Sequence, residues 1–310
     1  MRWFSRFFPE MEDQPVIKKW LVLLLLMGVG MALMTALARF FILVIWGAES
    51  LKQPGTFTSG EPGVVGMLRF MQLFSQLGLF VVPAIVYGWL MNRQPIRYLK
   101  LDVTPGLFFS FLSLTALILF IPAVNRMVVI NEQMSLPGWL SGLESWMRWQ
   151  EDQAAQLTGA FLEDGSVGGF LANLLIIGAM AAIGEEFLFR GVFIRLFHST
   201  LRNIHAAVFL SAFLFSALHL QFFGFFPRLV LGILFGYLFI WSGSLLLPVI
   251  LHFIFNSITI VGAWFYARGM SRVPVDDLGT GFPDSVVISS LALFTVVMYL
   301  LYRRRIAETF

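Results

Sequence analysis

Long apolar runs, separated by short polar segments, dominate the chain. Windows of about 20 apolar residues, the length that spans a bilayer as a helix, recur near residues 20–46, 67–91, 106–124, 171–198, 204–222, 223–242, 244–266 and 285–302. The pattern therefore predicts an all-α protein, a polytopic membrane helix bundle with about eight transmembrane helices.

The fifth and sixth apolar windows adjoin each other, and Pro227 with Arg228 interrupts the sixth. A broken or re-entrant helix inside a membrane protein is stable only where its free backbone groups meet protein or a water-filled cavity. A break in this part of the chain would therefore fit polar groups that line a cavity.

Composition excludes a soluble globule. Hydrophobic residues make up 58% of the chain and charged residues 13%, whereas soluble domains are about 45–50% apolar. The chain has no cysteine, so disulfides, thiolate catalysis and cysteine-ligated zinc are excluded.

The basic residues predict the topology. In an eight-span arrangement the main clusters fall on one side: Arg2, Arg6, Lys18 and Lys19; Arg93, Arg97 and Lys100; Arg195 and Arg202; Arg303, Arg304 and Arg305. Because positive loops stay inside, we expect a multi-pass protein of the cell membrane with both termini cytoplasmic. The net charge of +3 is small, and the basic residues gather on one side of the predicted membrane protein. We therefore expect the bilayer as a partner, and not nucleic acid. The first eight residues resemble an interfacial anchor.

The long outer segment, residues 125–166, carries Trp139, Leu143 and Trp146 at helical spacing. An amphipathic helix lying on the membrane surface is the favoured interpretation. A partner-binding module and a lid over a substrate entrance are the alternatives.

Three charges lie inside the fourth apolar run, in the sequence I-G-E-E-F-L-F-R from Ile183 to Arg190. On a helix, Glu186 and Arg190 are spaced for a structural ion pair, while Glu185 is rotated by about 100°. Ionisable groups at membrane depth are costly and usually functional. The alternative is that both glutamates merely end a transmembrane helix in a loop.

Two further polar clusters occur in the following apolar runs: Phe215 with His219, and His252 with Asn256, each four residues apart. A single intramembrane histidine more often makes a helix-to-helix hydrogen bond than catalyses a reaction. A glutamate, two imidazoles and a carboxamide together are what a water-activating hydrolase needs.

The ordered motifs E-E-x-x-x-R, F-x-x-x-H and H-x-x-x-N resemble those of the CPBP intramembrane proteases, which include CAAX prenyl endopeptidases and bacteriocin-processing and immunity proteins. The resemblance covers about Leu171 to Tyr266. It implies that Glu185 and His219 activate the attacking water, while His252 and Asn256 hold the oxyanion. A metal version is equally open, in which Glu185, His219 and His252 would bind zinc and leave one position for water.

On this basis residues 1–166 form a three-span region with the outer segment, residues 167–268 a CPBP-type catalytic core, and residues 269–310 a loop and the last span. The expected function is an intramembrane endopeptidase acting on a membrane-associated or prenylated-like protein or peptide. The alternative is a non-catalytic membrane immunity or scaffold protein of the same fold. A transporter is disfavoured, because no paired Gly/Pro-broken segments mark two halves.

Overall fold

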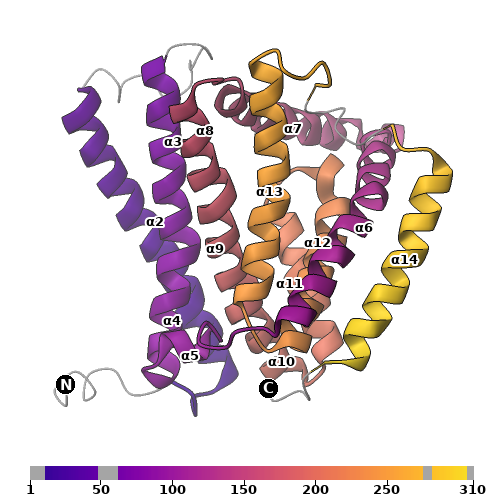
Figure 1. Cartoon of the computed structure of the whole chain (residues 1–310). Helices are drawn as coiled ribbons and strands as arrows, with labels where there is room; N and C mark the ends of the chain where they lie inside the picture. The colour runs from indigo at the N-terminus through magenta and orange to yellow at the C-terminus, as the bar shows by residue number, and fades with distance from the viewer. Residues whose placement is uncertain (1–10, 48–61, 275–280, 306–310) are drawn as a thin grey trace.

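Every regular element that the computed structural model describes is a helix (Figure 1). The described residues are 11–47, 62–274 and 281–305. In chain order the elements are α2 (Val16–Trp46), α3 (Pro62–Gln76), η2 (Leu77–Val81), α4 (Val82–Asn92), α5 (Pro95–Tyr98), α6 (Leu107–Glu132), η3 (Gly138–Leu140), α7 (Ser141–Leu162), α8 (Val167–Asn173), η4 (Leu174–Met180), α9 (Ala181–Glu186), η5 (Phe187–Phe193), α10 (Ile194–Leu201), α11 (Ile204–Ala217), η6 (Phe222–Gly224), α12 (Phe225–Ser242), α13 (Leu246–Ala267) and α14 (Asp284–Arg303).

Seven helices in the described ranges are long and apolar enough to cross a membrane, which confirms the polytopic helical bundle. The prediction of about eight differs at α11, which has only 14 residues. At 1.5 Å per residue α11 is about 21 Å long, shorter than a hydrocarbon core of about 30 Å. The chain turns back through Leu220, whose φ is 54°. The break thus precedes Pro227, which occupies the first turn of α12, where proline is tolerated.

The α12 helix is the most buried of the seven spans. Two glycines let it approach α11 closely: a Cβ on Gly232 would lie 2.9 Å from the Cβ of Ala212, and one on Gly236 would lie 2.8 Å from Val208. The G-x-x-x-G pattern therefore serves packing inside the monomer. This contact fixes the α11–α12 hairpin that carries one of the histidines.

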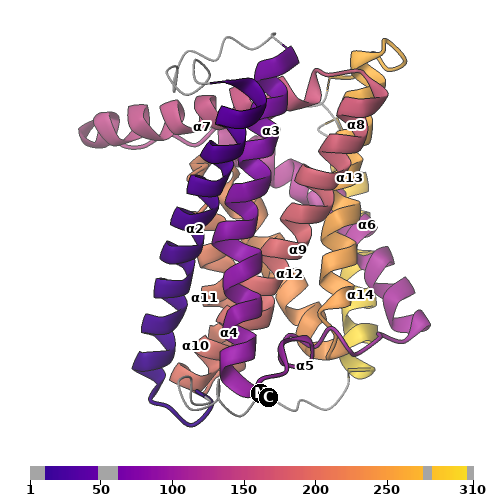
Figure 2. The ribbon, with the colours of Figure 1, turned by 90° about the vertical axis from the view of Figure 1, so that its left-hand side faces the viewer.

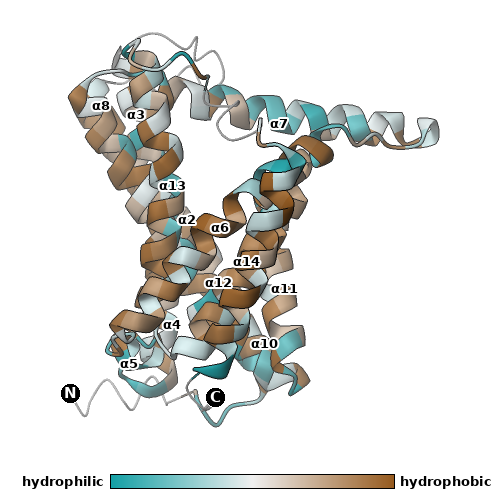
Figure 3. Cartoon of the chain, turned by 45° about the vertical axis from the view of Figure 1, so that its right-hand side comes forward, coloured by the Kyte–Doolittle hydropathy of each residue, from teal (hydrophilic) through white to brown (hydrophobic). Residues whose placement is uncertain are grey.

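The two ends of the bundle differ. Figure 1 places α5 and α10 at one end, together with the first turn of α2 and the last turn of α14, and places α7 at the other. Figure 2 and Figure 3 show α7 lying across its end of the bundle and extending beyond it. Trp139 and Trp146 are exposed there, as a surface helix requires. The expected anchor in residues 1–8 lies outside the described residues.

A buried arginine ties the end of α7 to the bundle. Arg69 of α3 donates to Asp164 (2.9 Å), to the side-chain oxygen of Asn173 (3.1 Å) and to the carbonyl of Phe161 (2.8 Å). A hydrogen bond from Ser166 and the neighbouring Arg69 lower the pKa of the Asp164 carboxyl. The last turn of α7 is thus held in a fixed position over the spans.

Cysteine labelling is expected to show which end faces the cytoplasm. Cysteine placed at Lys100 or Leu201, near the basic end, should resist an impermeant reagent in intact cells, whereas cysteine at Gln150 in α7 should react. The chain has no cysteine of its own, so any background signal is absent. The reverse pattern would overturn the orientation, and labelling after permeabilisation controls for buried sites.

Candidate active site

The helix that carries both glutamates is not a regular α-helix. The short α9 ends at Glu186 and lies between two π-helical segments, η4 and η5. Such wide turns are rare and often occur at functional sites. Glu185 and Glu186 are adjacent residues of α9, so they leave the helix about 100° apart and meet different surroundings.

The ion pair predicted from the four-residue spacing is present. Arg190 donates to the Oε1 atom of Glu186 at 2.8 Å, and the two side chains are 1% and 0% exposed. Arg190 also donates to the carbonyl of Gly232 at 3.1 Å and lies over the rings of Phe215 and Phe235. The two charges compensate each other in the core, although the Oε2 atom of Glu186 is buried without a hydrogen-bond partner among the described residues.

The same carboxylate also holds His252, a contact that the sequence did not predict. The Nδ1 atom of His252 lies 2.8 Å from Oε1 of Glu186, and its ring stacks on Phe235. Because a carboxylate can only accept, the hydrogen-bond network assigns the proton to Nδ1. In the neutral imidazole, Nε2 is then unprotonated, and it faces Glu185 with 3.7 Å to its Oε2 atom.

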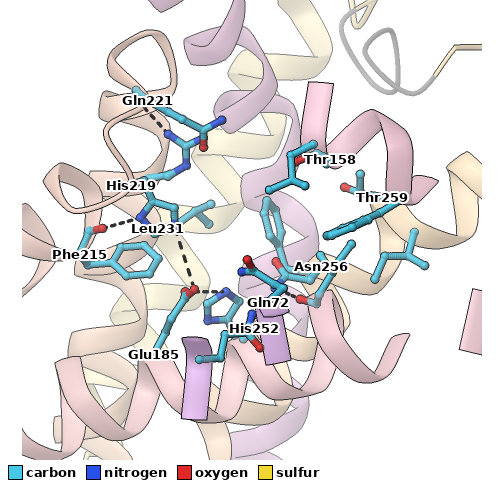
Figure 4. Close-up of a pocket in the computed structure, with 18 of the residues that line it drawn as sticks. Gln72, Thr158, Glu185, Phe215, His219, Gln221, Leu231, His252, Asn256 and Thr259 are labelled. Atoms are coloured by element: carbon cyan, nitrogen blue, oxygen red, sulfur yellow. Dashed lines mark hydrogen bonds and ion pairs between the residues drawn. The ribbon is translucent and has the colours of Figure 1, made fainter. Parts of the chain in front are cut away.

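His219 is oriented in the same way by a different acceptor. Its Nδ1 atom lies 2.6 Å from the carbonyl of Phe215, so Nδ1 carries the proton there too. Its Nε2 atom is 4.0 Å from Oε1 of Glu185. Figure 4 shows Glu185 between the two imidazoles. Both separations exceed a direct hydrogen bond and leave room for a bridging water.

Asn256 lies on another part of the same cavity wall. Its Nδ2 atom donates to the carbonyl of Ile177 at 3.0 Å, in the π-helical segment η4. Figure 4 shows it apart from Glu185, close to Thr259. One N–H of the carboxamide is thus used by the protein, and the second is available to a ligand.

These side chains share a cavity of about 480 Å³ with Glu185 in its wall. Residues from the last two turns of α7, Leu157, Thr158, Phe161 and Leu162, also line it. The cavity therefore reaches from the catalytic candidates to the end of the bundle at which α7 lies. The lid interpretation of the outer segment gains a structural basis from this contact.

The arginines that follow the glutamates in the sequence, Arg190, Arg195 and Arg202, predict a cavity that opens toward their end of the bundle. This prediction is wrong, because the cavity reaches the opposite end. No residue of α10 lines the cavity in the described part of the chain. Arg190 is sealed in the core, and Arg195 lies over the ring of Tyr98. Arg190 and Arg195 therefore pack inside the α10 end of the bundle and do not line the cavity.

Six polar residues of the cavity wall were missed as site candidates: Gln72, Gln76, Thr158, Gln221, Arg228 and Thr259. Gln76 is 5% exposed, and its Oε1 atom has no hydrogen-bond partner within the described protein. A buried amide without a partner is costly unless a water or a ligand satisfies it. The four-residue spacing of Gln72 and Gln76 inside an apolar run was the available sequence signal.

The candidate zinc ligands are spaced more widely here than a bound zinc ion would hold them. Oxygen and nitrogen ligands of tetrahedral zinc lie about 3.4 Å from each other, given metal–ligand bonds of about 2.0–2.2 Å. The Glu185 oxygens lie 3.7 and 4.0 Å from the two imidazole nitrogens. Among the described residues, no three His, Cys, Asp or Glu side chains form a group that could hold a metal ion. These side chains do not fit zinc as they are arranged here.

Residues 167–258 match the family model for type II CAAX prenyl endopeptidase Rce1-like proteins. The match supports a relation of this part of the chain to the CPBP/CAAX protease family. All three polar motifs lie within the matched CAAX protease region, as do the cavity residues of α12 and most of those of α13. Protease activity is the general property of this CAAX protease family, and a peptide or protein substrate follows from it. No curated protein and no solved structure matched the chain.

Proposed function

We propose that this protein is an intramembrane endopeptidase in which Glu185 activates a water molecule. The observation that carries the proposal is the placement of the Glu185 carboxylate within 4.0 Å of the Nε2 atoms of His219 and His252, inside a cavity. A bound water at this position can donate one hydrogen bond to Glu185 and one to an unprotonated imidazole nitrogen while its oxygen approaches a peptide carbonyl.

The reaction needs one proton transfer in each direction. Glu185 takes a proton from the water as its oxygen bonds to the carbonyl carbon, and the tetrahedral intermediate carries the negative charge on the former carbonyl oxygen. When the C–N bond breaks, Glu185 gives that proton to the leaving nitrogen. The products are a carboxylic acid and an amine, so atoms and charge balance.

The tautomer of His252 decides whether this side chain can donate a hydrogen bond to the oxyanion. With Nδ1 protonated, Nε2 of His252 accepts hydrogen bonds, so a neutral His252 orients water and cannot donate to the oxyanion. The second N–H of the Asn256 amide is the available neutral donor, whereas the unpaired atom of Gln76 is its Oε1, which can only accept a hydrogen bond. A donor of this kind contributes about 2.7–4 kcal/mol to stabilising a transition state.

The cavity limits the substrate. Its volume of about 480 Å³ is in the range of about 300–1,000 Å³ that holds a drug-sized ligand, so a short extended peptide segment fits and a folded domain does not. The wall also has apolar parts, which are formed by Leu157, Phe161 and Phe255. We therefore infer a flexible, membrane-associated segment, including a lipid-modified one, as the substrate.

Purified protein in nanodiscs is expected to cleave members of a proteome-derived peptide library. In water enriched in ¹⁸O, each new carboxyl end should gain one ¹⁸O atom, which mass spectrometry detects. This label shows that each new carboxyl end is formed by hydrolysis. A folded protein that leaves all peptides intact would refute the proposal and favour the non-catalytic scaffold.

A further inference from the structure

The cavity contains one guanidinium that the mechanism does not use. Arg228, in the first turn of α12, lines the cavity together with Glu185 and His219. Its Nη1 atom donates to the Gln221 carbonyl at 3.0 Å and its Nη2 atom to Gln221 Oε1 at 2.5 Å. A Cβ at position 224 would lie 2.6 Å from Nη1, so Gly224 leaves the space that the guanidinium occupies. The charge is therefore held at one place in the wall.

This charge has no ionic partner among the described residues. No carboxylate oxygen there lies within 4.0 Å of its nitrogens, and both hydrogen-bond acceptors on Gln221 are neutral. Glu151 and Glu185 act on it only at longer range. Glu151 is itself occupied, since it accepts a hydrogen bond from the Phe223 amide at 3.2 Å.

An arginine in a cavity inside the membrane is costly unless an anion pairs with it. A guanidinium has five N–H donors in a fixed planar arrangement that matches the two oxygens of a carboxylate. Two of the five are used by Gln221, so donors remain for a ligand. The other polar groups nearby, Gln72, Gln76 and Asn256, are neutral and suit peptide backbone.

We propose that Arg228 binds a carboxylate of the peptide substrate, which fixes the segment that extends from the scissile bond toward α7. This inference rests on the proposed protease function and adds a specificity site to it. The carboxylate is either the free C-terminus of the substrate or the side chain of an aspartate or glutamate. Both sources present the same pair of oxygens to the guanidinium.

The test uses apolar fluorescent hexapeptides in four forms, with a C-terminal acid or amide and with Asp or Asn at one internal position. Affinity is measured on the Glu185→Gln variant in nanodiscs, which needs no turnover, and kcat/KM on the enzyme with Glu185 intact. A hydrogen bond to a charged group contributes about 1.5–3 kcal/mol, which corresponds to about a 10- to 100-fold preference for a carboxylate form. Preference for acid over amide identifies the C-terminus, and preference for Asp over Asn identifies a side chain.

Arg228→Gln should reduce that preference to about one, with the change appearing in KM rather than kcat, while Arg228→Lys should keep part of it. Arg272→Gln, an exposed arginine outside the cavity wall, is the matched control and should keep all of it. An equal loss for all four peptides in Arg228→Gln would assign Arg228 a structural role and overturn the proposal, as would an absence of preference in the parent protein. If the peptides bind with the expected preference but none is cleaved, the protease function fails and the carboxylate site stands.

Discussion

Replacing Glu185 by glutamine is expected to abolish peptide hydrolysis without lowering the yield of folded protein. Glutamine has nearly the same shape but cannot accept the proton from water, and a general base contributes about 10²- to 10⁴-fold to the rate. Folding should be unaffected, because the carboxylate makes no direct hydrogen bond to either imidazole at 3.7 and 4.0 Å. Peptide turnover by purified protein in nanodiscs is the measurement.

The matched control for this variant is Glu163→Gln, which removes an exposed carboxylate next to α7 that does not line the cavity. Its turnover should equal that of the parent protein. If the purified Glu185→Gln variant retains turnover, Glu185 is not the base and the mechanism is refuted.

Replacing Glu186 by alanine should instead destabilise the fold. The change strands the buried charge of Arg190 and removes the acceptor of His252 Nδ1. Breaking a buried ion pair by removing one partner costs about 3–5 kcal/mol. Thermal or denaturant unfolding of the purified protein in detergent should show this loss directly.

A double variant separates stability from catalysis at this position. Glu186→Leu combined with Arg190→Met fills the same space with apolar side chains, which often restores the stability lost when one buried charge is removed. Turnover should remain low, because nothing then fixes the tautomer and ring orientation of His252. If the stable double variant turned over at the parental rate, Glu186 would have no role in positioning His252.

Local sequence spacing predicted the contacts that lie within one helix. The pair of Glu186 with Arg190 follows from four residues on a helix, and the apolar windows predicted the spans. The contact of Glu186 with His252 joins residues 66 positions apart. It depends on how α9 packs against α13, and the periodicity of a single sequence carries no information about that packing.

The same limit applies to the cavity wall. Arg228 is a single polar residue in an apolar run, which tells nothing about the direction that its helix faces. Only the assembled bundle places it in one cavity wall with Gln76 and Glu185. The end of the bundle at which the cavity opens was predicted wrongly, because the arginines after the glutamates were interpreted as leading to its water-filled mouth. In the structure they pair with Glu186 and pack on Tyr98.

The position of the cavity at the α7 end also decides which aqueous phase Glu185 exchanges protons with. If the basic end faces the cytoplasm, as the charge pattern predicts, the water reaching Glu185 comes from outside the cell, past Leu157 and Phe161 of α7. Under the proposed function, the water that is added to the substrate is then drawn from that phase.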